Sequence, residues 1–229
     1  MSGRVAYTGN LVTNGLVLNL DAGKLDSYPR NGTVWKDISN SQLTGSLLNG
    51  PTFNSENAGS IVFDGINDYG TLGTTIILPS GLSSSAFSAW WRYLGQGTGS
   101  DKRGFVLESA SFNYSLLVNT SGTLGVHINT TANGTQYVPG FIPVQGQWYN
   151  SAVVWDGTNL IVYINGVEVG RRAQGGTASE VSSLRIGTYR DNNNRWWVGN
   201  ISNISIYQRS LAPNEVLQNF NALRGRYGI

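Results

Sequence analysis

The sequence predicts an all-β protein: an antiparallel sandwich of two sheets with one short helix near the C-terminus. Three observations lead there. Short apolar segments alternate with polar residues, which is the period of half-buried strands. The 229 residues include 30 Gly and 24 Asn, which favour turns and disfavour helix interiors. Only 12% of the residues are charged, about half of the share common in globular proteins.

About a dozen segments show strand patterns separated by Gly, Asn, Ser or Pro. In the first, Leu16, Leu18 and Leu20 fall on one face, whereas Ala86–Leu94 is apolar on both faces and predicts a central strand. The predicted strands are Gly15–Asp21, Ser60–Asp64, Tyr69–Gly73, Ala86–Leu94, Gly104–Ser109, Tyr114–Asn119, Leu124–Asn129, Gln147–Trp155, Leu160–Asn165, Val167–Val169, Ser183–Thr188 and Val198–Tyr207.

Two local signals fix further elements. Asn165-Gly166 separates two apolar segments and suits a type I′ hairpin turn, in which both central residues need positive φ. Pro213 fits the first position of a helix, whose apolar residues then recur until Gly225 ends it. This helix is expected to cover one edge of the sandwich.

Residues 1–14 are polar and predict an N-terminal arm ordered by contact with something else, followed by one domain over residues 15–229.

Composition excludes several function classes. The net charge of +2 comes from scattered residues, so we expect no nucleic-acid binding, which needs clustered Lys and Arg. No apolar segment approaches the length of a membrane span, so no membrane partner is expected. The absence of Cys excludes disulfides, Cys-ligated zinc and a thiol nucleophile.

Three blocks carry a specific resemblance. They are Phe63–Tyr69 (FDGINDY), Trp155–Gly166 (WDGTNLIVYING) and the segment from Trp197 to Glu215. In this order they resemble the laminin-G-like, concanavalin A-like jelly-roll superfamily over roughly residues 15–223. The resemblance implies a jelly roll in which Trp197 points into the core. Trp196 should then point the other way, because successive strand side chains alternate.

Shorter motifs, among them Ser27-Tyr28-Pro29, Gly32–Trp35 and Asn49–Phe53, are similar to jelly-roll virion proteins of tailed bacteriophages. That resemblance implies a non-enzymatic structural protein on the virion surface, either a capsid decoration or a tail or fibre accessory, assembled in the host cytoplasm. Expected partners are other virion proteins, met through residues 1–14 or Arg224 and Arg226, in a homo-oligomer on the particle. The alternative is an adhesin module that binds bacterial surface polysaccharide, and the two roles are compatible.

One loop and one strand end carry residues suited to sugar binding. The loop offers guanidinium, carboxylate, amide and indole groups, which together bind hydroxyls and stack on sugar rings, although its Asn content equally fits a solvated turn. Asn113 lies near the position where calcium-binding relatives place ligands. The predicted carbohydrate-binding residues are Arg190, Asp191, Asn193, Arg195, Trp196 and Asn113.

Metal binding has weaker signals. Asp64 and Asp68 flank a turn in which Gly65 supplies positive φ and the carboxylates accept backbone N–H groups, the favoured interpretation over a metal or ligand role. Glu108 is the only carboxylate close in sequence to Asn113, whereas Ca²⁺ needs several oxygen ligands with negative charge. Asp64, Asp68 and Glu108 are therefore weak candidates for a calcium site, and no cofactor is expected with certainty.

A glycoside hydrolase is the least favoured function. The fold carries glucanases, which need two carboxyl groups about 5–10 Å apart across the scissile bond. The Glu-x-Asp-x-x-Glu pattern that the family's hydrolases place on one strand is absent. His127 has no second His for a metal site, so we expect a packed or edge histidine. The sequence names no catalytic residue.

Overall fold

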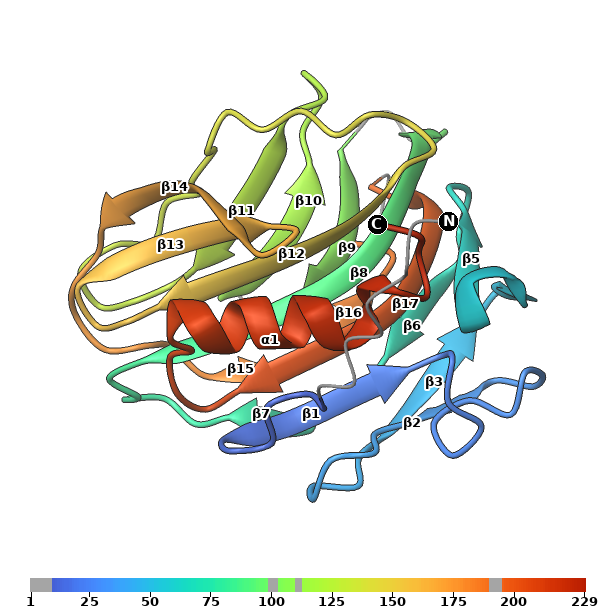
Figure 1. The fold of residues 1–229 in the computed structure, drawn as a ribbon, viewed down its shortest axis with the longest axis horizontal. Coiled ribbons are helices and arrows are strands. Elements are labelled where there is room, and N and C mark those ends of the chain that lie inside the picture. Colours follow the sequence, from blue (N-terminus) through green and yellow to red (C-terminus); the bar gives the residue numbers. More distant parts are fainter. Residues whose placement is uncertain (1–9, 99–102, 110–112, 190–194) are drawn as a thin grey trace, which may run out of the picture.

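The computed structural model describes residues 10–98, 103–109, 113–189 and 195–229. It has two large antiparallel sheets packed face to face and one helix, α1 (Pro213–Arg224), as the sequence predicts (Figure 1). The fold is a concanavalin A-like jelly-roll sandwich. In the described part of the chain, no helix is long and apolar enough to span a membrane.

The larger sheet has eight strands, in the order β14-β13-β12-β8-β17-β5-β4, with β1 also paired to β17. Its centre is the long pair of β8 and β17; the sequence predicts a central strand at β8 and a strand at β17. The bounds are β1 (Leu16–Asp21), β4 (Thr52–Asn54), β5 (Ser60–Asp64), β8 (Ser85–Gln96), β12 (Trp148–Trp155), β13 (Asn159–Ile164), β14 (Val167–Ala173) and β17 (Trp197–Tyr207).

The second sheet has seven strands, in the order β11-β10-β9-β16-β6-β3-β2, and a separate pair joins β15 to β7. Five short strands of the fold, β2, β3, β4, β7 and β15, have no counterpart among the predicted segments. The bounds are β2 (Val34–Lys36), β3 (Thr44–Leu48), β6 (Tyr69–Thr71), β7 (Ile76–Leu78), β9 (Gly104–Glu108), β10 (Tyr114–Val118), β11 (Leu124–Ile128), β15 (Val181–Ser182) and β16 (Arg185–Ile186); a short 3₁₀ turn covers Glu56–Ala58.

The main core lies between the two sheets. Trp91 and Trp197 meet edge to face with ring centroids 5.7 Å apart, an arrangement that the charge distribution of aromatic rings favours. The Asn165-Gly166 turn has φ values of 52° and 78°, which confirms the predicted hairpin between β13 and β14. Because successive side chains of a strand point to opposite faces, each sheet also has an outer face, which points away from this core.

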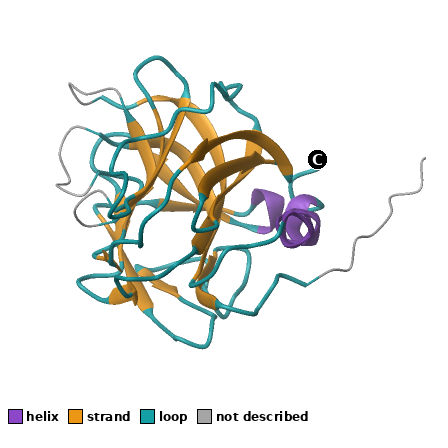
Figure 2. Ribbon diagram, turned by 90° about the vertical axis from the view of Figure 1, so that its left-hand side faces the viewer, coloured by secondary structure: helices purple, strands orange, loops and turns teal. Residues whose placement is uncertain are grey.

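Helix α1 packs on the outer face of the larger sheet (Figure 2). The expectation that it covers an edge of the sandwich is therefore wrong. The reason is a second apolar surface: Trp90 points away from the main core and stacks on Phe220, with ring centroids 5.7 Å apart. Pro213 stands in the first turn, the Glu215 carboxylate accepts the Ala212 N–H, and Gly225 follows the last helical residue.

The last five residues of the predicted arm lie against the domain of the same chain, with hydrogen bonds to α1 and to β17. The Val12 N–H donates to Asn219 Oδ1 (2.8 Å), and Tyr207 donates its hydroxyl proton to the Val12 carbonyl (3.1 Å). Gln218 Nε2 also donates to the Asn10 carbonyl (2.9 Å). Residues 10–14 are thus held by the domain itself, whereas residues 1–9 lie outside the described residues.

The C-terminal segment is fastened by an ion pair. Arg226 donates from two guanidinium nitrogens to the two carboxylate oxygens of Asp21, at 2.7 and 3.0 Å. The Asp21 side chain is 1% exposed and that of Arg226 19%. The sequence predicts Arg226 as a contact to other virion proteins; in the structure its charged group instead joins the end of the chain to β1.

Replacing Arg226 by Ala is expected to lower the free energy of unfolding by about 3 kcal/mol, because the buried Asp21 carboxylate loses its partner. Urea unfolding of both proteins measures the difference. Lys24→Ala, which removes an exposed cation near the same strand, is the control and should change stability little. Equal losses in the two variants would contradict a specific role for the pair.

Candidate functional site

A group of aromatic and arginine side chains lies on the outer face of the seven-stranded sheet. Ile186 and Leu107 are paired in register and point into the core, so their neighbours Arg185 and Glu108, also paired, point outward. We call the group the aromatic–arginine cluster. It consists of Tyr69, Arg185, Tyr189, Arg195 and Trp196.

One half of the cluster is built on the paired strands β6 and β16. The Arg185 guanidinium lies over the Tyr69 ring, 5.5 Å from its centroid, and donates a hydrogen bond to the Thr71 hydroxyl. The Tyr69 and Arg185 side chains are both half-buried. The cation–π contact and the hydrogen bond hold the guanidinium in one orientation. Because both side chains are only half-buried, part of each remains accessible to solvent.

The other half stands on β9 and on the chain beyond β16. The Tyr189 ring packs on Phe105, with centroids 5.0 Å apart, and the Arg195 guanidinium lies 4.1 Å from the centre of the Tyr189 ring. Phe105 is fully buried together with Leu117, in a small apolar cluster separate from the main core. The Tyr189 ring that carries the Arg195 guanidinium therefore packs on buried apolar side chains.

Trp196 connects the two halves. Its ring is 6.5 Å from that of Tyr69, and it follows Arg195 directly in the chain. Trp197 is fully buried in the main core, as the sequence predicts. Trp196 lies outside that core but is only 9% exposed, so little of its indole reaches the surface.

The turn from Asp64 to Asp68 positions Tyr69. Gly65 has φ of 77°, Asp64 Oδ1 accepts the Ile66 N–H (2.8 Å), and Asp68 Oδ2 accepts the Asp64 N–H (3.2 Å). These contacts confirm the predicted structural role of the turn. Burial raises the pKa of Asp68 to about 6, against the lowering effect of the Asp64 N–H and with a further rise from the Asp64 charge.

A row of buried polar residues lies beside the cluster. Glu108, Ser115 and His127 stand in register on β9, β10 and β11, and each is at most 1% exposed. His127 is thus a packed histidine, as predicted. Among the described residues, no three His, Cys, Asp or Glu side chains come together as a metal site, so Asp64, Asp68 and Glu108 remain only predicted candidates.

Of the six predicted sugar-binding residues, the structure describes Arg195, Trp196 and Asn113. Arg195 and Trp196 lie in the cluster, whereas Arg190, Asp191 and Asn193 lie outside the described residues. The Asn113 side chain donates to the Glu180 carbonyl (2.7 Å) and accepts from Asn129 Nδ2 (3.0 Å). Its amide thus joins loops within the fold.

Sequence reasoning missed Tyr69, Arg185 and Tyr189 as members of the site. Tyr69 belongs to a recognised motif and Arg185 to a predicted strand, but nothing local indicates that β16 lies between β6 and β9. The available signal was the position of Arg185 between the apolar Leu184 and Ile186, which places its side chain on the face opposite theirs.

The profile of the concanavalin A-like lectin/glucanases superfamily matches residues 64–217, about two thirds of the chain. The chain belongs to this superfamily. The match begins at the Asp64 turn and includes β16 and all of the cluster. No curated protein sequence matches this chain.

Solved structures of the same fold share little sequence with this superfamily member. Domain 4 of the arabinanase AbnA from Geobacillus stearothermophilus, in complex with arabinotriose, has a TM-score of 0.65 at 17% identity, over 91% of this chain and 99% of that one. The binding domain of botulinum neurotoxin DC in complex with SialylT has 0.70 at 12%, over 93% and 52%. A sialidase of Trypanosoma rangeli in complex with sialic acid has 0.64 at 14%, over 93% and 33%.

These identities establish a common fold. The chain spans about half of the toxin binding domain and a third of the sialidase, so it corresponds to one part of each. The fold is thus shared by a domain of a glycoside hydrolase and by binding domains of toxins.

Replacing Asp68 by Asn is expected to flatten the pH dependence of stability between about pH 4 and 6. The folded pKa of about 6 lies above the ordinary 3.8, so the folded protein binds more protons than the unfolded chain in this window. Wild-type stability therefore falls as pH rises through it, by about 1–2 kcal/mol after allowance for solvent screening.

Urea unfolding of both proteins at pH 4 and pH 7 measures the effect. The Asn variant should be the more stable protein at pH 7, because its amide can accept the Asp64 N–H without a buried charge. The same pH slope in both proteins would contradict the assignment.

Proposed function

We propose that this protein is a non-enzymatic carbohydrate-binding module whose binding surface is the aromatic–arginine cluster. The observation that carries the proposal is the placement of two guanidinium groups against tyrosine rings on one outer sheet face, at 5.5 and 4.1 Å. Aromatic edges and faces pack against the C–H surfaces of sugar rings, and fixed guanidinium N–H groups donate to hydroxyl or carboxylate oxygens.

The same face favours binding over hydrolysis. On the described strands β6, β16, β9, β10 and β11, the outward side chains include one carboxylate, that of Glu108, and it is fully buried. Glycoside hydrolysis needs a pair of carboxyl groups on opposite sides of the bond. A fixed surface with a single buried carboxylate suits retention of a glycan without cleavage.

Arg185→Ala is expected to weaken glycan binding about tenfold, because it removes a cation–π contact and a hydrogen-bond donor together. A glycan array with neutral and acidic oligosaccharides, arabinotriose and sialylated glycans included, identifies the ligand. Calorimetry then compares the variants.

Arg172→Ala is the matched control. Arg172 lies over Tyr137 at the same 5.5 Å, but on the edge strand β14, away from the cluster. The affinity of the Arg172→Ala variant for the glycan should equal that of the wild type. A loss of equal size in both variants, or none in Arg185→Ala, would refute the proposed surface.

The virion role is a second proposal, which rests only on the resemblance of short motifs in this sequence to those of phage virion proteins. It is compatible with glycan binding, since a molecule held by its helix side would present the cluster outward. In this proposal the chain sits on the virion surface as a decoration or tail accessory. Mass spectrometry of purified phage particles tests it, and absence of the chain from the particle would refute it.

A further inference from the structure

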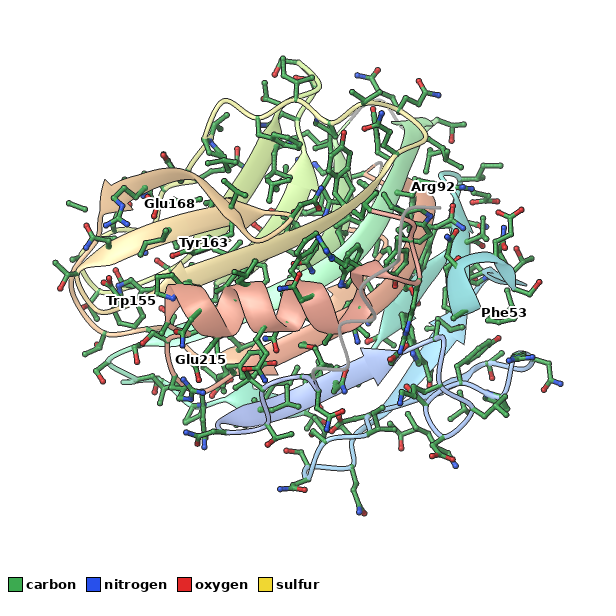
Figure 3. All side chains as sticks on the ribbon, in the orientation of Figure 1. Phe53, Arg92, Trp155, Tyr163, Glu168 and Glu215 are labelled. Atoms are coloured by element: carbon green, nitrogen blue, oxygen red, sulfur yellow. The ribbon has the colours of Figure 1, made fainter. Side chains whose placement is uncertain are left out.

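A groove lies on the opposite side of the sandwich, where the start of α1 approaches the outer faces of β12 and β13. Its volume is about 400 Å³, within the range of small-ligand sites. Apolar side chains line part of it: Val154, Ile161, Leu211 and Pro213. Figure 3 shows Tyr163 and Glu215, which line the same groove, on the helix side of the sheet.

Two ion pairs give the groove rigid walls. Arg209 donates to both carboxylate oxygens of Glu215, at 2.8 and 2.6 Å, and also to the carbonyls of Asn14 and Ser210. Arg171 donates to both oxygens of Glu168, each at 2.6 Å. Bidentate pairs fix both partners, so these groups are held before a ligand arrives.

Tyr163 supplies an unused polar group. Its side chain is only 3% exposed, yet its hydroxyl forms no hydrogen bond with the described residues. Burial raises the pKa of this phenol, and the charge of Glu168 raises it further, so the group stays protonated at neutral pH. A protonated phenol both donates and accepts, which matches a ligand hydroxyl.

The charges of the groove select against anions. Partial burial acts to raise the pKa of Asp156, but amide hydrogen bonds from Asn159 and Thr158, together with the Arg171 charge, outweigh it and lower the pKa. Asp156 is therefore ionised at neutral pH. Around the groove, the carboxylates of Asp156, Glu168 and Glu215 outnumber the two guanidinium groups of Arg171 and Arg209, so a negatively charged ligand would meet net repulsion from the described residues.

We infer that this groove is a second carbohydrate site, which binds one or two residues of a neutral saccharide. The apolar lining takes the C–H surface of the sugar, and the Tyr163 hydroxyl and the outer N–H groups of Arg171 bind its hydroxyls. The site lies on the outer face of the larger sheet, whereas the aromatic–arginine cluster lies on that of the smaller sheet. Neither site depends on the other.

Titration of the isotope-labelled full chain with cellobiose, maltose and lactose, followed by amide NMR, tests the inference. We expect shifts of the amides of residues 156–164 and 210–215 at millimolar sugar. Tyr163→Phe should weaken this binding about tenfold, because it removes only the hydroxyl that meets the ligand. Glucuronic acid, the anionic probe, should bind the groove more weakly than all three.

Tyr93→Phe is the matched control, since the Tyr93 hydroxyl also forms no hydrogen bond with the described residues but lies away from the groove, beside Trp197. It should leave the shifts unchanged. The inference is overturned if none of the neutral sugars shifts the groove amides, if Tyr163→Phe binds like the wild type, or if glucuronic acid binds better.

Arg185→Ala separates the two sites. It should leave binding in the groove intact, so a failure of the cluster and a failure of the groove give different results.

Discussion

The pairing of β17 with β8 determines where almost every other element lies. The two strands stay paired from Trp197 opposite Gln96 to Tyr207 opposite Ala86. On its other side, β17 pairs first with β5 and then with β1. Strands from the beginning, middle and end of the chain therefore meet on one strand, and the two large faces of the sandwich take their orientation from it.

Buried polar side chains make this arrangement specific. Asn203 donates to Asn19 Oδ1 and to the Leu20 carbonyl, which joins β17 to β1. Asn200 donates to Ser60 on β5 and accepts from Arg92 on β8. A shift by one residue would leave these buried amides unsatisfied, at a cost that apolar contacts alone would not impose. The same register holds Trp197 in the core and leaves Trp196 and Arg195 in the cluster.

The sequence predicts well the features that depend on neighbours along the chain. The Asn165-Gly166 turn requires only local geometry and is present. In Leu16–Asp21 the prediction is right for Leu18 and Leu20, which share the main core, and wrong for Leu16, because a β-bulge between Leu16 and Leu18 places Leu16 in the apolar layer on the other face of the sheet. The cluster depends on pairing between distant segments: Arg185 meets Tyr69 because β16 pairs with β6 across more than a hundred residues. Short strands such as β15, with two residues, carry too little alternation to be recognised. The position of α1 was predicted wrongly because Trp91 packs in the main core, whereas its neighbour Trp90 packs in a second apolar layer under the helix.

Both ends of the described chain lie on the helix side of the sandwich. Asn10 is bonded to Gln218 of α1, and Tyr227 stacks on Trp90 with ring centroids 4.0 Å apart. A fusion partner, a fluorescent tag or a surface tether attached directly at Asn10 or after Tyr227 would therefore leave from the same side. The cluster on the seven-stranded sheet would face away from the attachment, while access to the groove beside α1 would depend on the length of the tether.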